Sequence, residues 1–570
     1  MERAQVHYEV WTRRKPGAGW SLELAVEDRE RAIETAEELF ATAKAVAVKV
    51  SKETLDEDSR EFKTVNILSK GDTKETKVKK AKDTLDPLCV SPADLYTGHA
   101  RERIGRLLHE WLTRQRVTPF ELLHRADLIE KLEAAGMDLQ HAVQKIAVPE
   151  AQDRGVSVHE LIRHYHKLIQ TAIDRVLNDY KRKAFPNIEE EGFGPACERL
   201  TGEPERHYLL GGGVARHIGK GATWSEKVAF LLDLADAAPQ VAQARALAFQ
   251  VLETSLAEIL GSRAGMTDLL GPELDLGGNL AAMTRLAASD TVDLLVGVEP
   301  VVARMMPVLK GPAARLANWL EGPQFEMVRA ALAQRVLREL TSPRRLRPDD
   351  PAGEINILRA LAMCLTAAAG KLMPLEQVQD AFAERSRMLV RSDFVEVYLG
   401  EDKNALEEVE ALLWLAENIT GAANKRSASR WIGANIAALR FERDVRSDSG
   451  SPATRLANLA NLQRGVARVG LLGEEIAPIQ VKVGEVAGWV EADAKLIHLL
   501  GRASAPLAQR ITLLTKLATG ETAPLGPVTE RARQEIMRLM RAPEARAEVG
   551  QHPELLAKVR DLIQQGGLAA

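Results

Sequence analysis

The glycine-rich string from Gly211 to Thr223, GGGVARHIGKGAT, contains residue types that bind phosphate. A phosphate-binding loop of the GxxxxGK[ST] type needs fixed spacing between its glycines and a Gly-Lys-Ser/Thr sequence. Here Val214 occupies a required glycine position, and Gly221 follows Lys220. The spacing excludes that loop, so we interpret the string as a mobile loop between helices, with anion contact through exposed amides as the alternative.

The same string resembles a second kind of phosphate site. His217-Ile-Gly-Lys220-Gly221 is similar to the HxxKG pattern around a phosphotransfer histidine. That resemblance implies an exposed histidine in the middle of a long bundle helix, with His217 as acceptor and Lys220 beside it. The nearby glycines weaken such a helix, each by about 1 kcal/mol relative to alanine.

Seven of the twelve histidines fall between His99 and His166, most densely in SVHELIRHYHKLIQ, which holds His159, His164 and His166. The HEL core resembles the H-box of sensor histidine kinases, which implies that His159 receives phosphate on a dimerising helical hairpin. The chain departs from that pattern at 162–164, and no glycine-rich ATP-binding boxes follow. Phosphotransfer is therefore an alternative rather than the leading hypothesis.

Glu160 also fits two simpler interpretations. Ser157 and Glu160 have the spacing of a capping box, which predicts a helix start. Glu160 and His164 share a helix face at i,i+4, but a zinc-protease pattern needs two histidines at that spacing. His159 and His164 point about 140° apart around a helix. A metal site would need a further ligand such as His109 or His124 from a neighbouring helix, so no metal or other cofactor is predicted.

Other reaction chemistry is not indicated. The chain has no GxSxG elbow, no CxxC and no GxGxxG after a strand, so an enzyme is not favoured but stays open. Basic stretches at 101–116, 181–183 and 344–347 are candidates for nucleic-acid contact, but Glu102 and Glu110 interrupt the first. Nucleic-acid binding is therefore left open and not favoured.

Composition limits the class of protein. The chain has 570 residues, 45% of them hydrophobic, and a formal net charge of −4, so no global field attracts nucleic acid or anionic lipid. Cys89, Cys197 and Cys364 are widely separated, as expected of reduced thiols in a cytosol. The N-terminal sequence lacks a signal-like apolar core, and no long uncharged apolar run occurs. We expect a cytoplasmic chain without membrane insertion, from a GC-rich bacterial genome.

The predicted secondary structure differs between the first 70 residues, where strands are expected, and the rest of the chain, where helices are expected. Val6, Tyr8 and Val10 alternate as in a strand, 20–26 predicts a second strand, and Asp28 predicts a helix start. Strands over 46–50 and 62–68 complete a small ββαββ module. Helix starts then follow at Ser91, Thr118, Ser157 and Thr223, and helices continue to the C-terminus. The predicted fold is mainly α, with this small α+β module followed by a multi-helical, irregular α-solenoid-like body.

These patterns divide the chain into five segments. They are the ββαββ module at 1–70, a charged linker at 71–88, a His-rich helical bundle at 89–190, a Gly-rich connection at 191–222 and a helical stack at 223–570. Residues 345–352 are a candidate sub-boundary. The strings LGGNLAAM and IGANIAAL, at 276–283 and 432–439, are one of three faint internal similarities, whose origin by duplication is left open.

The leading functional hypothesis is a non-catalytic interaction, scaffold or regulatory protein of the bacterial cytoplasm. Helical stacks present extended concave surfaces, and the sequence supplies many helices without recognisable reaction machinery. The expected partners are proteins, and self-association is left open. The alternative from a different class is a signalling protein whose bundle, between His99 and Phe185, performs phosphotransfer or senses a ligand.

Overall fold

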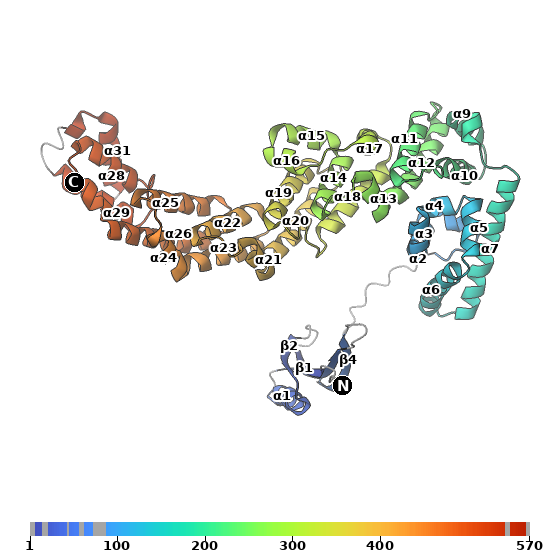
Figure 1. Ribbon diagram of the computed structural model, residues 1–570, viewed down its shortest axis with the longest axis horizontal. Helices are drawn as coiled ribbons and strands as arrows, with labels where there is room; N and C mark the ends of the chain where they lie inside the picture. The colour runs from blue at the N-terminus through green and yellow to red at the C-terminus, as the bar shows by residue number, and fades with distance from the viewer. Residues whose placement is uncertain are drawn as a thin grey trace. The chain divides into compact units, whose positions relative to one another are not determined.

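A computed structural model describes residues 6–13, 21–42, 45–55, 62–71, 87–541 and 548–565. The chain divides into two units, Met1–Leu88 and Cys89–Ala570. Most of the predicted linker at 71–88 lies outside the described residues. The fold-class prediction is confirmed, because a small antiparallel sheet with one helix precedes a body made of helices (Figure 1).

The first unit is the predicted ββαββ module. Its elements are β1 (Val6–Arg13), β2 (Ser21–Val26), α1 (Arg29–Ala41), β3 (Ala47–Leu55) and β4 (Phe62–Gly71). The antiparallel sheet has the order β2-β1-β3-β4. Asp28 caps α1, as predicted, by accepting hydrogen bonds from the backbone nitrogens of Glu30 and Arg31. Tyr8 and Val10 contribute to the core between the sheet and α1.

The second unit begins with the helices of the predicted His-rich bundle. They are η1 (Pro92–Tyr96), α2 (Gly98–Leu107), α3 (His109–Gln115), α4 (Pro119–Leu122), α5 (Ala126–Ala134), α6 (Met137–Arg154), α7 (Val158–Lys181) and α8 (Ile188–Glu191). Trp111 of α3, Leu128 of α5 and Val176 of α7 belong to one hydrophobic core. Tyr208, beyond the predicted bundle, also belongs to this core, whereas Ile188 of α8 belongs to the core of the following stack.

The helical stack follows, and its elements continue to the end of the described chain. They are α9 (Phe193–Leu200), α10 (Arg206–Ile218), α11 (Trp224–Asp236), α12 (Ala242–Gly261), α13 (Arg263–Leu270), α14 (Leu276–Ala287), α15 (Ser289–Val298), α16 (Pro300–Met305), α17 (Gly311–Glu321), α18 (Glu326–Leu340), α19 (Pro351–Ala367), α20 (Leu375–Leu389), α21 (Ser392–Leu399), α22 (Ala405–Asn418), α23 (Ala422–Ala437), α24 (Leu439–Ser447), α25 (Pro452–Arg468), α26 (Gly473–Ala494), α27 (Leu496–Arg502), α28 (Leu507–Ala518), α29 (Pro527–Met540) and α31 (Pro553–Gln565).

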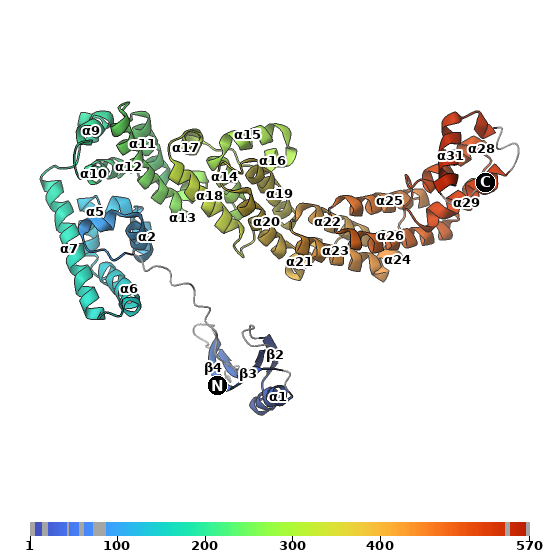
Figure 2. The ribbon, with the colours of Figure 1, turned by 180° about the vertical axis from the view of Figure 1, so that it is seen from behind.

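Neighbours along the chain are mostly neighbours in space within this stack. For example, α11 packs on α12, α22 on α23, α25 on α26, and α28 on α29 (Figure 2). One continuous hydrophobic core runs from Phe120 to Leu562. None of the helices in the described residues is both long and apolar enough to cross a membrane.

The structure shows which elements occupy two of the predicted connecting segments. Within the predicted Gly-rich connection at 191–222 lie α9 and α10, and Gly211 to Gly213 of α10 pack against His124, Phe185 and Pro186. The candidate sub-boundary at 345–352 is part of the stack core. Leu346 is fully buried, its oxygen accepts a hydrogen bond from the Gly277 nitrogen at 2.9 Å, and its nitrogen donates to the buried carboxylate of Glu354 at 3.2 Å.

The strongest internal similarity occupies different positions in its two copies. LGGNLAAM begins α14 at Leu276, whereas IGANIAAL ends α23 and continues into α24. A duplicated helix would place the two strings at the same position, so this pair argues against a simple repeat. Whether the other similarities reflect duplication stays a prediction.

Candidate functional site

A cleft of about 1130 Å³ separates α2 and α3 from α12 and α13. Residues 116–119, the start of α11 and part of α18 complete its walls. Four arginines line it, together with three acids and apolar side chains that include Trp224 and Met327. The cleft therefore combines charged and apolar surface, as binding sites commonly do.

One arginine of the cleft is neutralised within the protein. Arg101 of α2 donates from Nε to Oε1 of Glu258 on α12 at 2.6 Å. The other carboxylate oxygen of Glu258 accepts a hydrogen bond from the Phe120 nitrogen at 2.6 Å. Desolvation raises the pKa of Glu258, and the charge of Arg101 opposes this shift. The pair ties the bundle to the stack and leaves little charge available for a ligand.

The other three arginines, Arg106, Arg116 and Arg263, are exposed at the cleft. Arg116 donates to the backbone oxygen of Ala222 at 3.3 Å, which leaves its charge without a carboxylate partner. Arg106 and Arg263 have no ion pair or hydrogen bond within the described part of the chain. Three guanidinium groups on one cleft can therefore receive carboxylates from outside.

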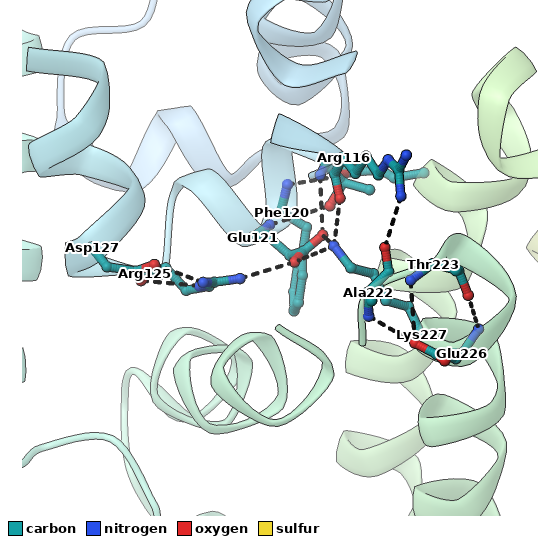
Figure 3. Close-up of polar contacts among 11 residues, drawn as sticks. Arg116, Phe120, Glu121, Arg125, Asp127, Ala222, Thr223, Glu226 and Lys227 are labelled. Carbon is teal, nitrogen blue, oxygen red and sulfur yellow. Dashed lines mark hydrogen bonds and ion pairs between the residues drawn. The ribbon is translucent and has the colours of Figure 1, made fainter. Parts of the chain in front are cut away.

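Next to residues that line the cleft, the starts of α4 and α11 are joined by a buried ion pair (Figure 3). Thr118 caps α4 with Glu121, and Thr223 caps α11 with Glu226, so both predicted cap positions are confirmed. Lys227 of α11 donates from Nζ to both carboxylate oxygens of Glu121, at 2.8 and 2.9 Å. Its third contact is the backbone oxygen of Arg116 at 2.5 Å.

The ion pair is almost completely shielded from water. The Glu121 side chain is 0% exposed and that of Lys227 3%. Desolvation lowers the pKa of Lys227, while the charge and hydrogen bond of Glu121 oppose that shift. Arg125 supplies a further charge at 3.3 Å from Glu121, and the Thr118 nitrogen donates to the same carboxylate. Lys227, Arg125 and the Thr118 nitrogen all contact Glu121, and the ion pair with Lys227 joins α4 to α11.

The candidate histidines of α7 lie away from this cleft. His159, Glu160 and His166 are exposed, and His159 is in the first turn of α7 rather than in its middle. Ser157 occupies the predicted N-cap position, but its side chain makes no capping hydrogen bond, so the predicted box with Glu160 does not form. Nothing in the structure brings these side chains together into a site.

His164 instead has a structural contact. Its Nε2 lies 2.8 Å from the backbone oxygen of Cys89, which connects α7 to the start of the second unit. Within the described residues, no group of three or more His, Cys, Asp and Glu side chains has the arrangement of a metal site.

His217 and Lys220, at the end of α10, both approach Glu189. The Lys220 ammonium forms an exposed ion pair with Glu189, and His217 Nδ1 lies 4.0 Å from the same carboxylate. Burial lowers the pKa of His217, and Glu189 opposes this shift. His217 also packs against the Phe230 ring, which is unlike the open position expected of a phosphotransfer histidine.

The interpretation of Gly211 to Gly213 as a mobile loop is wrong. These three glycines are buried inside α10. A Cβ at Gly211 would lie 2.6 Å from His124 Nε2, and one at Gly213 would lie 2.6 Å from Pro186 Cγ. A Cβ at Gly212 would overlap the Phe185 ring. The glycines therefore allow α10 to pack closely on the bundle, which outweighs their low helix propensity.

Replacing Gly212 with alanine is expected to loosen this contact. The new methyl group must displace Phe185, and overpacking of this kind costs about 1–3 kcal/mol. Hydrogen exchange of α10 in the full chain should become correspondingly faster. The control is Gly297→Ala in α15, where nothing lies within 4 Å of the new Cβ. That variant should slow exchange in α15, since alanine favours a helix by about 1 kcal/mol. Equal protection of α10 with and without Gly212→Ala would contradict the packing role.

Sequence reasoning identified Arg101, Arg106 and Arg116 as a basic stretch and Thr118 and Thr223 as caps. It missed Glu258 and Arg263 on the opposite wall, and it missed the pair of Glu121 with Lys227. The Thr118-x-x-Glu121 spacing marks Glu121 as a capping residue. No local pattern connects it to Lys227, which is 106 residues away along the chain.

Comparison with known protein families, with curated proteins and with solved structures finds no match to this chain.

Proposed function

We propose that the helical unit is a protein-binding stack that holds an acidic segment of a partner protein in the cleft. The observation that carries this proposal is the set of three exposed guanidinium groups, Arg106, Arg116 and Arg263, without carboxylate partners on one cleft. Arginine binds carboxylates in a bidentate geometry, which gives orientation as well as affinity.

The size of the cleft supports a polypeptide ligand. Sites for small molecules usually enclose about 300–1,000 Å³, and this cleft is larger at about 1130 Å³. Its apolar lining, which includes Leu112, Trp224 and Met327, suits the apolar face of an amphipathic segment. A segment with carboxylates on one side and apolar side chains on the other satisfies both kinds of surface.

The charges of the cleft favour a peptide over a nucleic acid. Glu102, Glu258 and Asp268 line the same cleft as its four arginines, so the lining is nearly neutral. A nucleic-acid backbone presents closely spaced phosphates and requires a continuous basic surface. Separate carboxylates on a peptide can reach the arginines and avoid the acids.

A scaffold or regulatory role in the cytoplasm belongs to the same proposal. The three cysteines are buried and not in disulfides, which is typical of proteins in reducing compartments. In this role the protein binds its partner and catalyses no reaction.

Fluorescence anisotropy with two labelled synthetic peptides tests the cleft. One peptide combines leucine, alanine and glutamate at helical spacing, and the other has lysine in place of each glutamate. The full chain should bind the acidic peptide, with affinity that falls as salt rises. Arg106→Glu combined with Arg263→Glu should weaken binding at least tenfold, since attraction becomes repulsion at two positions.

The matched control is Arg430→Glu combined with Arg468→Glu, which changes net charge equally at exposed positions outside the cleft. This control should bind the acidic peptide as the unmodified chain does. Equal loss in both double variants would show a general charge effect and refute the cleft as the site. Tighter binding of a single-stranded oligonucleotide than of the acidic peptide would favour nucleic acid instead.

A further inference from the structure

The core of the bundle contains a cavity of about 130 Å³, separate from the cleft. Aliphatic side chains of α2, α5, α6 and α7 form nearly all of its wall, among them Ile104, Ile129, Ala142 and Ala172. Folded cores are normally close-packed and contain few spaces larger than a water molecule. A space of this size inside a bundle core is therefore unusual, and it loses the contacts that a filled core would make.

The two tyrosine hydroxyls in the cavity wall already have hydrogen-bond partners. The Tyr96 hydroxyl donates to the backbone oxygen of Leu123 at 2.9 Å. The Tyr165 hydroxyl donates to Glu150, a carboxylate that also accepts from Arg154 Nε at 2.9 Å and lies 3.7 Å from Arg103. A water in the cavity would find few partners. Arg103, a charged residue of the wall, already lies 3.7 Å from Glu150, so an anionic ligand would have to compete with this ion pair. The wall therefore selects for an uncharged, apolar occupant.

The helix α6, which forms part of the cavity wall, is bordered by a glycine at each end. Gly136 precedes α6 with φ 57° and Gly155 follows it with φ 67°, and a Cβ at either position would touch nothing within 4 Å. The backbone at both ends of α6 therefore tolerates rotation that other residues resist. The Tyr165 hydroxyl of α7 donates to Glu150 of α6, so this hydrogen bond connects the two helices beside the cavity.

We infer that the cavity in the bundle core binds a small, uncharged, apolar molecule, such as one with a single aromatic ring or a compact branched hydrocarbon chain. The size supports this class, since an apolar cavity of about 150 Å³ in another protein stays dry and admits benzene. The site is independent of the acidic-peptide cleft, because the two share no wall residue. If the bundle senses a ligand, as the alternative hypothesis states, this cavity is where we expect the ligand to bind.

Saturation-transfer NMR and titration calorimetry with toluene test this inference on the full chain. Toluene should bind with a dissociation constant below about 1 mM, and it should raise the melting temperature because it binds only the folded bundle. Benzoate, which has a similar size and one negative charge, should not bind. Ala172→Leu should fill the cavity from α7 and weaken toluene binding at least tenfold.

Two further variants make the test decisive. Ala142→Leu fills the cavity from α6, and it replaces Ala172→Leu as the test if circular dichroism shows that the latter misfolds. Ala134→Leu places the same side chain on the exposed end of α5 and should bind toluene like the unmodified chain. Absence of toluene binding, equal binding of benzoate, or unchanged binding after cavity filling would each overturn the inference.

Discussion

Replacing Lys227 with methionine is expected to lower the free energy of opening of α4 and α11 by about 3 kcal/mol. Breaking a buried ion pair costs about 3–5 kcal/mol, because one charge remains in the protein without its partner. Glu121 would keep its hydrogen bond from the Thr118 nitrogen and its contact with Arg125. Because Glu121 keeps those contacts, we expect a loss of opening free energy at the lower end of the 3–5 kcal/mol range, about 3 kcal/mol.

The measurement is hydrogen exchange of α4 and α11 in the full chain, since a chain of this size does not unfold in one step. Combining Lys227→Met with Glu121→Gln should recover most of the loss. Glutamine keeps an oxygen for the Thr118 nitrogen and removes the buried charge. Arg125 would still have Asp127, which lies 2.6 Å from it.

Lys220→Met provides the matched control, because Lys220 forms an exposed pair with Glu189. Exposed pairs contribute little, since water and salt screen them, so exchange should not change measurably. If Lys227→Met altered exchange no more than Lys220→Met does, the buried pair would not be the contact that holds α4 on α11.

Acid is expected to loosen the contact between α4 and α10 through His124. This ring is fully buried among Tyr96, Phe120 and Tyr208, and burial lowers its pKa to about 4. Nδ1 lies 2.7 Å from the backbone oxygen of Phe120 and donates to it. Nε2 has no hydrogen-bond partner among the described residues, so a proton there would be buried without an acceptor.

The sign of the effect follows from this lowered pKa. An unfolded histidine titrates near pH 6.5, so between about pH 6.5 and pH 4 the unfolded chain binds a proton that the folded chain excludes. The stability of the neutral, buried ring is present above pH 6.5 and is lost as the pH falls to 4. The shift corresponds to about 3 kcal/mol over the whole interval.

Hydrogen exchange of α4 and α10 at pH 7.5 and 4.5, corrected for intrinsic exchange rates, measures this loss. His124→Phe keeps a ring in the aromatic cluster and removes the titrating group, so its α4 and α10 should lose less protection on acidification. The exposed His159 provides the control, and His159→Phe should behave as the unmodified chain does. An unchanged pH dependence in His124→Phe would assign the acid sensitivity to other groups.

Local sequence signals were sufficient to predict several individual helices and strands. The alternation at Tyr8 and Val10 predicted β1, and the three-residue spacings at Thr118 and Thr223 predicted the starts of α4 and α11. Such signals depend on the backbone of a few neighbouring residues, so they can be read without knowledge of distant contacts. The mainly helical fold with its ββαββ module follows from many signals of this kind.

Contacts between residues far apart in the sequence could not be predicted and depend on how the helices pack. Gly211 to Gly213 have low helix propensity, and their helix exists because His124, Phe185 and Pro186 occupy the space that side chains would need. Glu121 and Lys227 become partners because α4 packs near α11, and Arg263 faces Arg106 across a cleft that no sequence pattern marks. Burial and long-range packing set these contacts, and those energies outweigh local propensities.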